Sequence, residues 1–240
     1  MLSIIIPTRN EEQHLPRLLE SLKHQTIPEG TTLEIIVADA GSKDNTREIA
    51  ISYGCKVVQG GLPAQGRNAG AAAAQGGELL FLDADATLER GFLGRFLTEA
   101  RQRDLDVAGC SLKVVEPSLL FRFGIFLWNA YFWASQKVFQ HAANCIYAKR
   151  WIHERIGGFD ERIKFGEDCV YARAAAKVGR FGFLFSSGVF ASPRRIKTEG
   201  GALKFFRKYI GAEFRMVALR KNIMLDDSFE YSFDHSKQDP

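Results

Sequence analysis

Two aspartates, Asp83 and Asp85, form a D-x-D pair at the end of the segment LLFLDAD. Two carboxylates this close repel each other unless a cation lies between them. An isolated pair of this kind is more often a turn in which an aspartate caps the next helix. This pair, however, follows a predicted buried strand. That position favours a site where Asp85 binds a divalent cation that neutralises a diphosphate.

Asp39 and Arg67 carry groups that could hold a nucleotide. Asp39, in VADAGSKDNT, ends a predicted strand, where its carboxylate could accept a hydrogen bond from a base N–H. Capping of the next helix would account for Ser42 and Asp44 but not for Asp39. Arg67, in AQGRNAG, precedes an alanine-rich predicted helix, and its planar guanidinium could bind a phosphate. A solvated arginine is an equally good interpretation of that position.

Glu167 and Asp168 open a predicted helix in FGEDCVYARAAAKVG. The helix dipole favours acidic residues there, so capping alone accounts for one of them. The other, Asp168, is a candidate general base that removes a proton from an acceptor hydroxyl. The preceding GGFDE segment favours this interpretation, because its glycines are typical of a tight active-site loop.

Short apolar runs that alternate with helical patterns must position these side chains. The predicted strands are 2–6, 33–37, 56–58 and 79–82, and the predicted helices begin at Asn10, Asp44 and Asn68. This alternation predicts an α/β fold with a Rossmann-like, mostly parallel sheet and helices on both faces. Ligands of such sheets bind beyond the carboxyl ends of the strands. The segments at those ends are 7–11, 39–44 and 83–85.

The sequence lacks the motifs of several other classes of protein. It has no GxxxxGK[ST] segment and no GxGxxG after its first predicted strand, which argues against P-loop and dinucleotide-binding sites. Its four cysteines are widely spaced, without a CxxC pair or zinc-ligand spacing, and are expected to be reduced thiols. The first residues contain no basic leader, and we therefore expect a cytoplasmic protein.

Six segments, taken together, resemble the large inverting glycosyltransferase family two in order and spacing over residues 2–195. They are PTRNEE, VADAGSKDNT, GRNAGAAAA, LLFLDAD, GGFDE and GEDCVYARAAAKVG. The resemblance implies the GT-A fold and an enzyme that transfers a sugar from a nucleoside-diphosphate sugar to an acceptor hydroxyl. It also implies inversion at the anomeric carbon and Mg²⁺ or Mn²⁺ as the cofactor.

The resemblance further implies a role for each matching residue. Asp85 would ligate Mg²⁺ or Mn²⁺, and Asp168 would be the general base. Asp39 would lie near the base of the nucleotide, with Arg67 and Asp83 near its ribose and diphosphate. The full set of donor-binding residues in the matching motifs would be Pro7, Thr8, Glu11, Asp39, Arg67 and Asp83.

The sequence departs from the family pattern at two points. Asp39 is followed by Ala40 where the common form has a second acid, and no histidine lies near Arg194 where some relatives place another metal ligand. Metal affinity is therefore expected to be modest. Arg194 and Arg195, in SPRR, could instead bind the diphosphate or an anionic acceptor. The QxxRW motif of the family's processive synthases is absent, so repeated addition to a polymer is not expected.

The character of the sequence changes after Glu116. We predict a donor-binding half over 1–115, an acceptor-side half over 116–225 with a helical C-terminal region, and a flexible acidic tail over 226–240. The second half opens with an apolar stretch, 119–134, whose uninterrupted runs are too short to span a bilayer. Its Trp and Tyr residues suit a membrane interface, whereas a helix at the edge of the core would show the same composition.

Positive charge is concentrated near the C-terminus. Between Arg194 and Lys221, nine Lys or Arg residues stand against two Glu, within a net charge of +4 for the whole chain. The stretch 202–222 has the pattern of a basic amphipathic helix, which suits an anionic membrane surface and equally a solvated helix packed on the sheet. With 119–134, it leads us to expect peripheral attachment to the inner face of the plasma membrane and a lipid-linked acceptor.

Three other functions compete with sugar transfer. A sugar-nucleotide nucleotidyltransferase would share the fold and the metal-bound carboxylate, but would carry a glycine-rich Arg and Lys signature where this chain has PTRNEE. A non-catalytic nucleotide-sugar-binding module would fit if Glu167 and Asp168 faced away from the cleft. Nucleic-acid binding is not expected, because no stacking aromatics or reading motif accompany the basic stretch.

Overall fold

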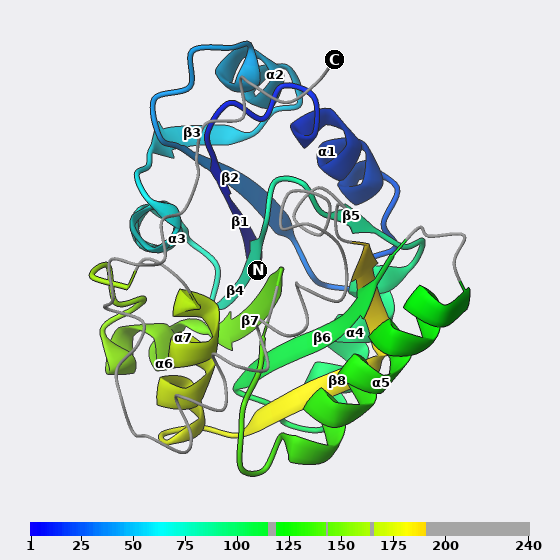
Figure 1. The fold of residues 1–240 in the computed structure, drawn as a ribbon. Helices are drawn as coiled ribbons and strands as arrows, with labels where there is room; N and C mark the ends of the chain where they lie inside the picture. Colours follow the sequence, from blue (N-terminus) through cyan, green and yellow to red (C-terminus); the bar gives the residue numbers. More distant parts are fainter. Residues whose placement is uncertain (115–118, 143, 164–165, 191–240) are drawn as a thin grey trace.

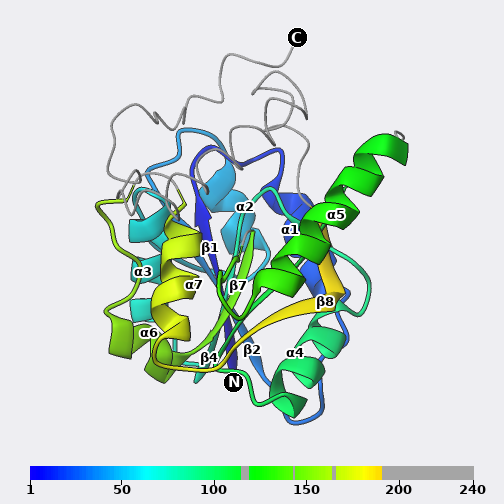
Figure 2. The same cartoon turned by 60° about the horizontal axis from the view of Figure 1, so that its bottom comes forward.

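The computed structural model describes residues 1–114, 119–142, 144–163 and 166–190, in which one sheet lies between layers of helices (Figures 1 and 2). The strands are β1 (Leu2–Thr8), β2 (Leu33–Asp39), β3 (Lys56–Gln59), β4 (Glu78–Leu82), β5 (Thr87–Leu88), β6 (Val107–Lys113), β7 (Cys145–Lys149) and β8 (Phe181–Phe190). The helices are α1 (Leu15–Lys23), α2 (Thr46–Ser52), α3 (Pro63–Ala73), α4 (Phe92–Gln102), α5 (Leu119–Ser135), α6 (Arg150–Ile156) and α7 (Glu167–Ala176).

The sheet has the strand order β3-β2-β1-β4-β7-β6-β8-β5. Strands β3, β2, β1 and β4 are parallel, as the sequence predicts. Strand β7 runs antiparallel to both β4 and β6, and β5 runs antiparallel to β8, so the whole sheet is mixed. The predicted donor and acceptor halves share this sheet, because β7 belongs to the second half and lies between β4 and β6 of the first.

Alternate side chains of the central strand β1 fill two cores. Leu2, Ile4 and Ile6 pack with apolar residues of α1, α2 and α4 on one face of the sheet. Ile5 packs on the other face with residues of α3, α6 and α7, and Figure 2 shows these two groups of helices on opposite sides. Burial from both faces explains why apolar residues dominate both sides of this strand instead of alternating with polar ones.

The helices do not begin where the sequence analysis places them. Helix α1 begins at Leu15 rather than Asn10, because Asn10 has a positive φ of 54° and its N–H bonds to Ser42 in a neighbouring loop. Helix α2 begins two residues after the predicted start. Helix α3 begins at Pro63, where proline's fixed φ suits a first turn, so Arg67 lies inside the helix and not before it.

Helix α3 lies close against β1 because its inward positions are glycine and alanine. A Cβ placed on Gly70 would lie 2.3 Å from Cγ2 of Ile5, and one placed on Gly66 would lie 3.0 Å from Cβ of Pro7. Such contacts leave no room for a side chain. The alanine-rich stretch therefore sets the distance between the helix and the strand, and with it the position of Arg67.

The apolar stretch 119–134 forms α5, which packs along β6 and β8. Ile125, Asn129 and Phe132 are buried, while much of the opposite face is exposed. No helix within the described ranges is both long and apolar enough to span a bilayer. Arg194, Arg195 and the stretches 202–222 and 226–240 lie outside the described residues.

Replacing Gly70 with valine should lower the free energy of unfolding by about 2 kcal/mol or more, because the new side chain would overlap the rigid, fully buried Ile5. Urea denaturation followed by circular dichroism measures this change. Gly77→Val is the matched control, since nothing lies within 4 Å of a Cβ placed there. Equal stability of the two variants would contradict the close packing of α3 on β1.

Candidate functional site

Arg67 is the centre of a buried charge cluster to which three elements contribute. The residue lies on α3 and is only 5% exposed. Its Nη1 donates a hydrogen bond to Oε1 of Glu167 at 2.6 Å, and its Nη2 donates to Oδ1 of Asp83 at 2.7 Å. Asp83 follows β4, and Glu167 opens α7. The interpretation of Arg67 as a solvated side chain is therefore wrong, since it joins α3 to the end of β4 and the start of α7.

The charge of Arg67 is held in place by its partners. Burial disfavours the charged guanidinium and lowers its pKa, but the charges of Asp83 and Glu167 outweigh burial and raise the pKa above its ordinary value. Asp168 adds a third carboxyl to the cluster, and its charge also raises the pKa of Arg67. One guanidinium thus faces three acidic groups, an imbalance that favours a further cation or a proton at this place.

The loop between α6 and α7 is hydrogen-bonded to Asn68, the residue after Arg67. The Asn68 side chain accepts a hydrogen bond from the N–H of Phe159 at 2.8 Å and donates one to its carbonyl at 2.9 Å. The Phe159 ring lies 5.3 Å from the guanidinium carbon of Arg67 and stacks on Tyr171 at 4.0 Å between ring centroids. Gly158 has a φ of 77°, which allows the tight turn that precedes Phe159.

Asp168 follows Glu167 at the first turn of α7 and is partly buried. Burial, followed by the negative charge of Glu167, raises the pKa of the Asp168 carboxyl to about 7, while Arg67 acts in the opposite direction. A carboxyl that titrates near neutral pH can serve as a general base there. Because Glu167 bonds to Arg67, which also bonds to Asp83, this member of the acidic pair faces the end of β4.

Asp83 and Asp85 follow β4, as predicted, and both are partly buried. The N–H of Asp83 donates to the carbonyl of Asn144 at 3.3 Å, which ties this turn to the residue before β7. Their carboxylates offer the hard oxygen donors that Mg²⁺ and Mn²⁺ prefer. Within the described part of the chain, no group of three or more His, Cys, Asp or Glu could hold a metal. Asp83 and Asp85 could bind such an ion only together with other oxygens, such as those of phosphate or water.

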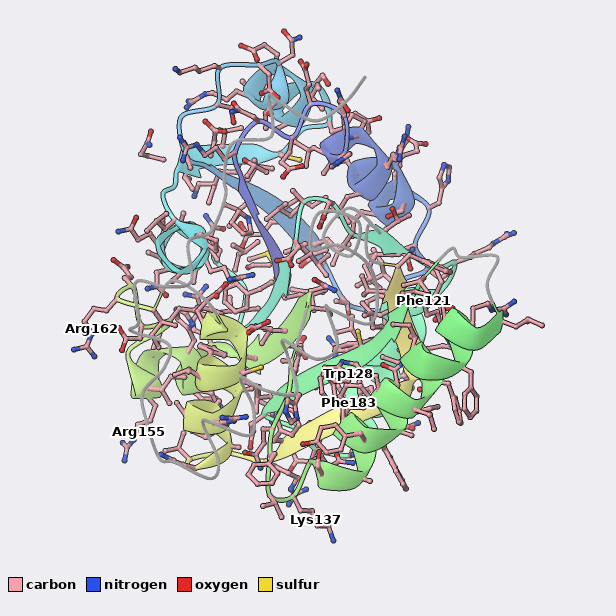
Figure 3. All side chains as sticks on the ribbon, viewed as in Figure 1. Phe121, Trp128, Lys137, Arg155, Arg162 and Phe183 are labelled. Atoms are coloured by element: carbon pink, nitrogen blue, oxygen red, sulfur yellow. The ribbon has the colours of Figure 1, made fainter. Side chains whose placement is uncertain are left out.

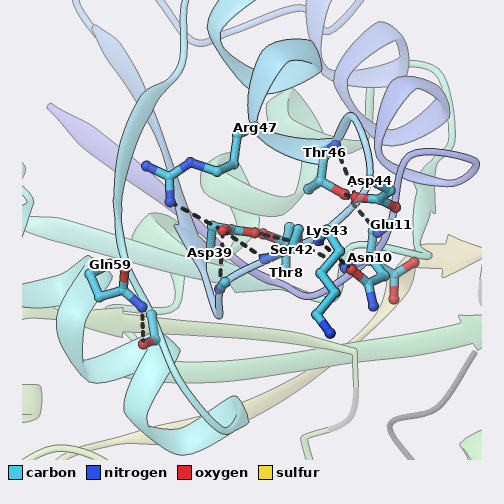
Figure 4. Close-up of polar contacts among 12 residues, drawn as sticks. Thr8, Asn10, Glu11, Asp39, Ser42, Lys43, Asp44, Thr46, Arg47 and Gln59 are labelled. Atoms are coloured by element: carbon cyan, nitrogen blue, oxygen red, sulfur yellow. Dashed lines mark hydrogen bonds and ion pairs between the residues drawn. The ribbon is translucent and has the colours of Figure 1, made fainter.

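Asp39 closes the loop that follows β2 (Figure 4). Its side chain is fully buried, and its Oδ2 accepts hydrogen bonds from the N–H groups of Gly41 and Ser42, each at 3.1 Å. Arg47 Nη1 lies 3.3 Å from the same oxygen. Helix capping was expected to account for Ser42 and Asp44 but not for Asp39, and in the structure the Asp39 carboxylate is bound by its own loop. A contact between Asp39 and a nucleotide base stays a prediction.

The loop after β1 lies beside the Asp39 loop. Thr8 pairs with Asp39 in the parallel sheet, and its Oγ1 donates to Oδ1 of Asp39 at 3.4 Å. The N–H of Glu11 donates to the hydroxyl of Thr46 at 2.8 Å, a contact that Figure 4 shows. Pro7, Thr8 and Glu11 therefore lie with Asp39 at the predicted edge of the sheet.

Some residues of the site escaped the sequence analysis. Asn68 stands in the same GRNAG motif as Arg67, but nothing in its spacing indicates a partner 91 residues away. Glu167 was recognised as a possible cap, and its pairing with Arg67 was not foreseen. Arg194 and Arg195 lie outside the described residues, so their predicted contacts stay predictions.

Removing the Arg67 guanidinium with Arg67→Ala should lower the free energy of unfolding by about 3–5 kcal/mol, because buried carboxylates would lose their counter-charge. The loss should be larger well above the Asp168 pKa of about 7 than well below it, since protonation relieves the repulsion. Urea denaturation at several pH values measures both effects. Arg103→Ala, which breaks an exposed pair with Glu99, should change stability by less than about 1 kcal/mol. A pH-independent loss would contradict the electrostatic account.

Curated proteins similar to this chain are glycosyltransferases by name. The uncharacterized glycosyltransferase EpsJ of Bacillus subtilis is 34% identical over 118 residues, which are 46% of this chain and 33% of that protein. Glycosyltransferase AglE of Haloferax volcanii is 29% identical over 126 residues, 48% of this chain and 40% of its own length. The chain thus spans only a third to two fifths of these two relatives.

Solved structures share the fold at lower sequence identity. TarS 1–349 of S. aureus in complex with UDP-GlcNAc has a TM-score of 0.63 and 23% identity, over 79% of this chain and 58% of that one. The mannosyltransferase PcManGT of Pyrobaculum calidifontis, in complex with GDP-Man and Mn²⁺, has a TM-score of 0.65 and 18% identity, over 93% of this chain and 69% of that one. The predicted GT-A architecture is therefore confirmed.

The family is shown by a match that covers more than half of the chain. Residues 3–154 match the model described as glycosyl transferase family 2. This segment contains the loops after β1 and β2, Arg67 on α3, and the Asp83 and Asp85 turn. The chain belongs to glycosyl transferase family 2.

Proposed function

We propose that this chain transfers a sugar from a nucleoside-diphosphate sugar to an acceptor hydroxyl, with inversion at the anomeric carbon. The observation that carries the proposal is the cluster in which Asp168, with a pKa raised to about 7, lies beside the Arg67 bridge to Asp83. A base that titrates near neutral pH and a phosphate-binding edge are the two parts that such a displacement needs.

In the proposed reaction, Asp168 accepts the proton of the acceptor hydroxyl while the acceptor oxygen attacks the anomeric carbon. The bond from that carbon to the diphosphate oxygen breaks, and the nucleoside diphosphate leaves with the electron pair. One base and one displacement invert the configuration. Glu167 and Arg67 act as positioning residues, because their ion pair holds the first turn of α7 against the end of β4.

The donor would bind along the edge formed by the loops after β1, β2 and β4. Thr8, Glu11 and Asp39 lie at the nucleoside end of that edge, and Asp83 lies at the diphosphate end. The Asp39 side chain is fully buried by its own loop. A contact with the nucleotide base would therefore require a shift of the backbone N–H groups that donate hydrogen bonds to Asp39. Because Arg67 already binds two carboxylates, we propose no direct contact between its guanidinium and a phosphate.

Mg²⁺ or Mn²⁺, when bound, would supply positive charge that neutralises the diphosphate leaving group. Asp85 is the residue that would hold the ion, and Asp83, engaged by Arg67, would orient the turn around it. Two structural neighbours support this donor class, since their complexes contain UDP-GlcNAc in one case and GDP-Man with Mn²⁺ in the other. The sugar, the nucleotide and a lipid-linked acceptor stay predictions.

Asp168→Asn should retain donor binding and lower the transfer rate by about a hundredfold or more, because an amide cannot accept the proton. In the unaltered chain the rate should fall as the pH drops below about 7, since the carboxyl is then protonated. A coupled assay of nucleoside diphosphate release across pH, together with the donor-induced rise in melting temperature, measures both. Asp160→Asn, in the same loop region, serves as the control. Loss of donor binding together with transfer would show a structural role instead.

Asp85→Asn should weaken Mn²⁺ binding in the presence of a nucleoside diphosphate by about tenfold or more, since one of the few protein oxygens available to the ion loses its charge. Electron paramagnetic resonance of free Mn²⁺ measures this without any need for turnover. The control is Asp104→Asn, which changes an exposed acid between α4 and β6. Unchanged Mn²⁺ affinity in the Asp85 variant would exclude Asp85 as the ligand.

A further inference from the structure

Helix α5 carries apolar side chains on both its inner and its outer side, and large apolar side chains on the outer side are exposed. Apolar residues recur at the helical spacing on the outward side, and several are more than half exposed. A helix that is hydrophobic all round normally lies inside a core or in a membrane. We call these side chains the α5 outer face: Leu119, Phe123, Phe126, Leu127 and Trp133.

The opposite side of α5 fixes the orientation of the outer face. Asn129 is buried, its Oδ1 accepts a hydrogen bond from the N–H of Leu112 at 2.9 Å, and its Nδ2 donates to the Leu112 carbonyl at 2.8 Å. Phe132 meets Phe183 of β8 edge-on, with 5.9 Å between ring centroids. Figure 3 labels Trp128 on α5 and Phe183 on β8, the strand against which this helix packs. Rotating the helix to bury the outer face would break these contacts.

The outer face continues onto the sheet. Phe123 and Phe126 stack at 6.5 Å, and Phe126 meets the exposed Phe185 of β8 edge-on at 6.1 Å between ring centroids. The patch therefore spans two elements and presents aromatic rings side by side. Contiguous exposed apolar surface of this kind marks an interaction site, whereas scattered single residues do not.

The charges around the outer face identify its partner. From Leu119 to Ser135 the sequence has no acidic residue and one basic residue, the exposed Arg122. Lys137, just past the helix, is exposed and extends away from the body of the protein (Figure 3). A second copy of this face would set like charges against each other. The chain's own stretch 194–221, with nine basic residues and two acidic ones, has the same sign and is a poor match.

We propose that the α5 outer face docks onto an anionic lipid bilayer, with the helix lying in the interfacial plane. Its phenylalanine and leucine side chains enter the acyl boundary, while Trp133 suits the headgroup level. Arg122 and Lys137 contact anionic headgroups. The stretch 194–221 lies outside the described residues, and its sequence adds positive charge to the chain as a whole. The protein lies on the membrane through this face without spanning it.

The test is co-sedimentation of the full chain with vesicles of equal parts phosphatidylglycerol and phosphatidylcholine at low salt. The unaltered chain should pellet with these vesicles and stay in solution with pure phosphatidylcholine. An outer-face variant should lose about tenfold or more in partition coefficient, since its large apolar side chains no longer leave water. That variant carries Phe123→Gln, Leu127→Gln and Trp133→Gln.

A matched control carries the same number of changes at exposed apolar residues of other elements. Its melting temperature reports the general effect of such changes, and its vesicle binding should equal that of the unaltered chain. The control carries Ile51→Gln, Trp151→Gln and Val178→Gln. Brominated lipid should quench the tryptophan fluorescence of the unaltered chain. This quenching should be lost in Trp133→Phe and kept in Trp151→Phe.

Three results would overturn the proposal. The first is an unaltered chain that stays in the supernatant with anionic vesicles at low salt. The second is an outer-face variant that binds as well as the control, because binding would then belong to the basic stretch alone. The third is an unaltered chain that is a dimer and an outer-face variant that is a monomer, with equal vesicle binding by the two. A second copy of the chain would then cover this face.

Discussion

The ion pairs of Arg67 hold the candidate functional site of this protein together. A guanidinium buried to this extent is stable only with counter-charges, and they come from residues 16 and 100 positions away. Helix α3, the end of β4 and the start of α7 are therefore fixed relative to each other by one side chain. The same cluster holds more acidic groups than basic ones, and this imbalance, added to burial, raises the pKa of Asp168 to about 7.

Helix α5 illustrates why an apolar segment can serve two environments. Its inner side is held against β6 by Asn129. The side-chain amide of Asn129 makes hydrogen bonds to both the N–H and the carbonyl of Leu112, as the backbone of a neighbouring strand would. Its outer side exposes large apolar side chains and carries no acidic group. The interpretation as a core helix holds for the inner side, and a membrane interface is our proposal for the outer side. Composition alone could not separate them, because both sides are equally apolar.

Local sequence was a good guide where a segment's environment is uniform. The apolar runs of strands β1 to β4 marked these strands to within two residues, and β1 and β4 are buried from both faces. The start of α1 was misplaced because Asn10, a good cap by residue type, is held at a positive φ by the loop after β2. Asp39 was predicted to bind a ligand. The N–H groups that donate hydrogen bonds to it belong to a loop whose path the sequence does not show.

The sequence by itself determined the α/β class, the four parallel strands and the acids at their carboxyl ends, because periodicity and strand ends are local properties. Only the tertiary structure decided which charges meet. The pairing of Arg67 with Glu167 requires α7 to return beside α3, and that return depends on β7 inserting antiparallel between β4 and β6. No local pattern encodes strand order, because that order follows from packing both faces of the whole sheet at once.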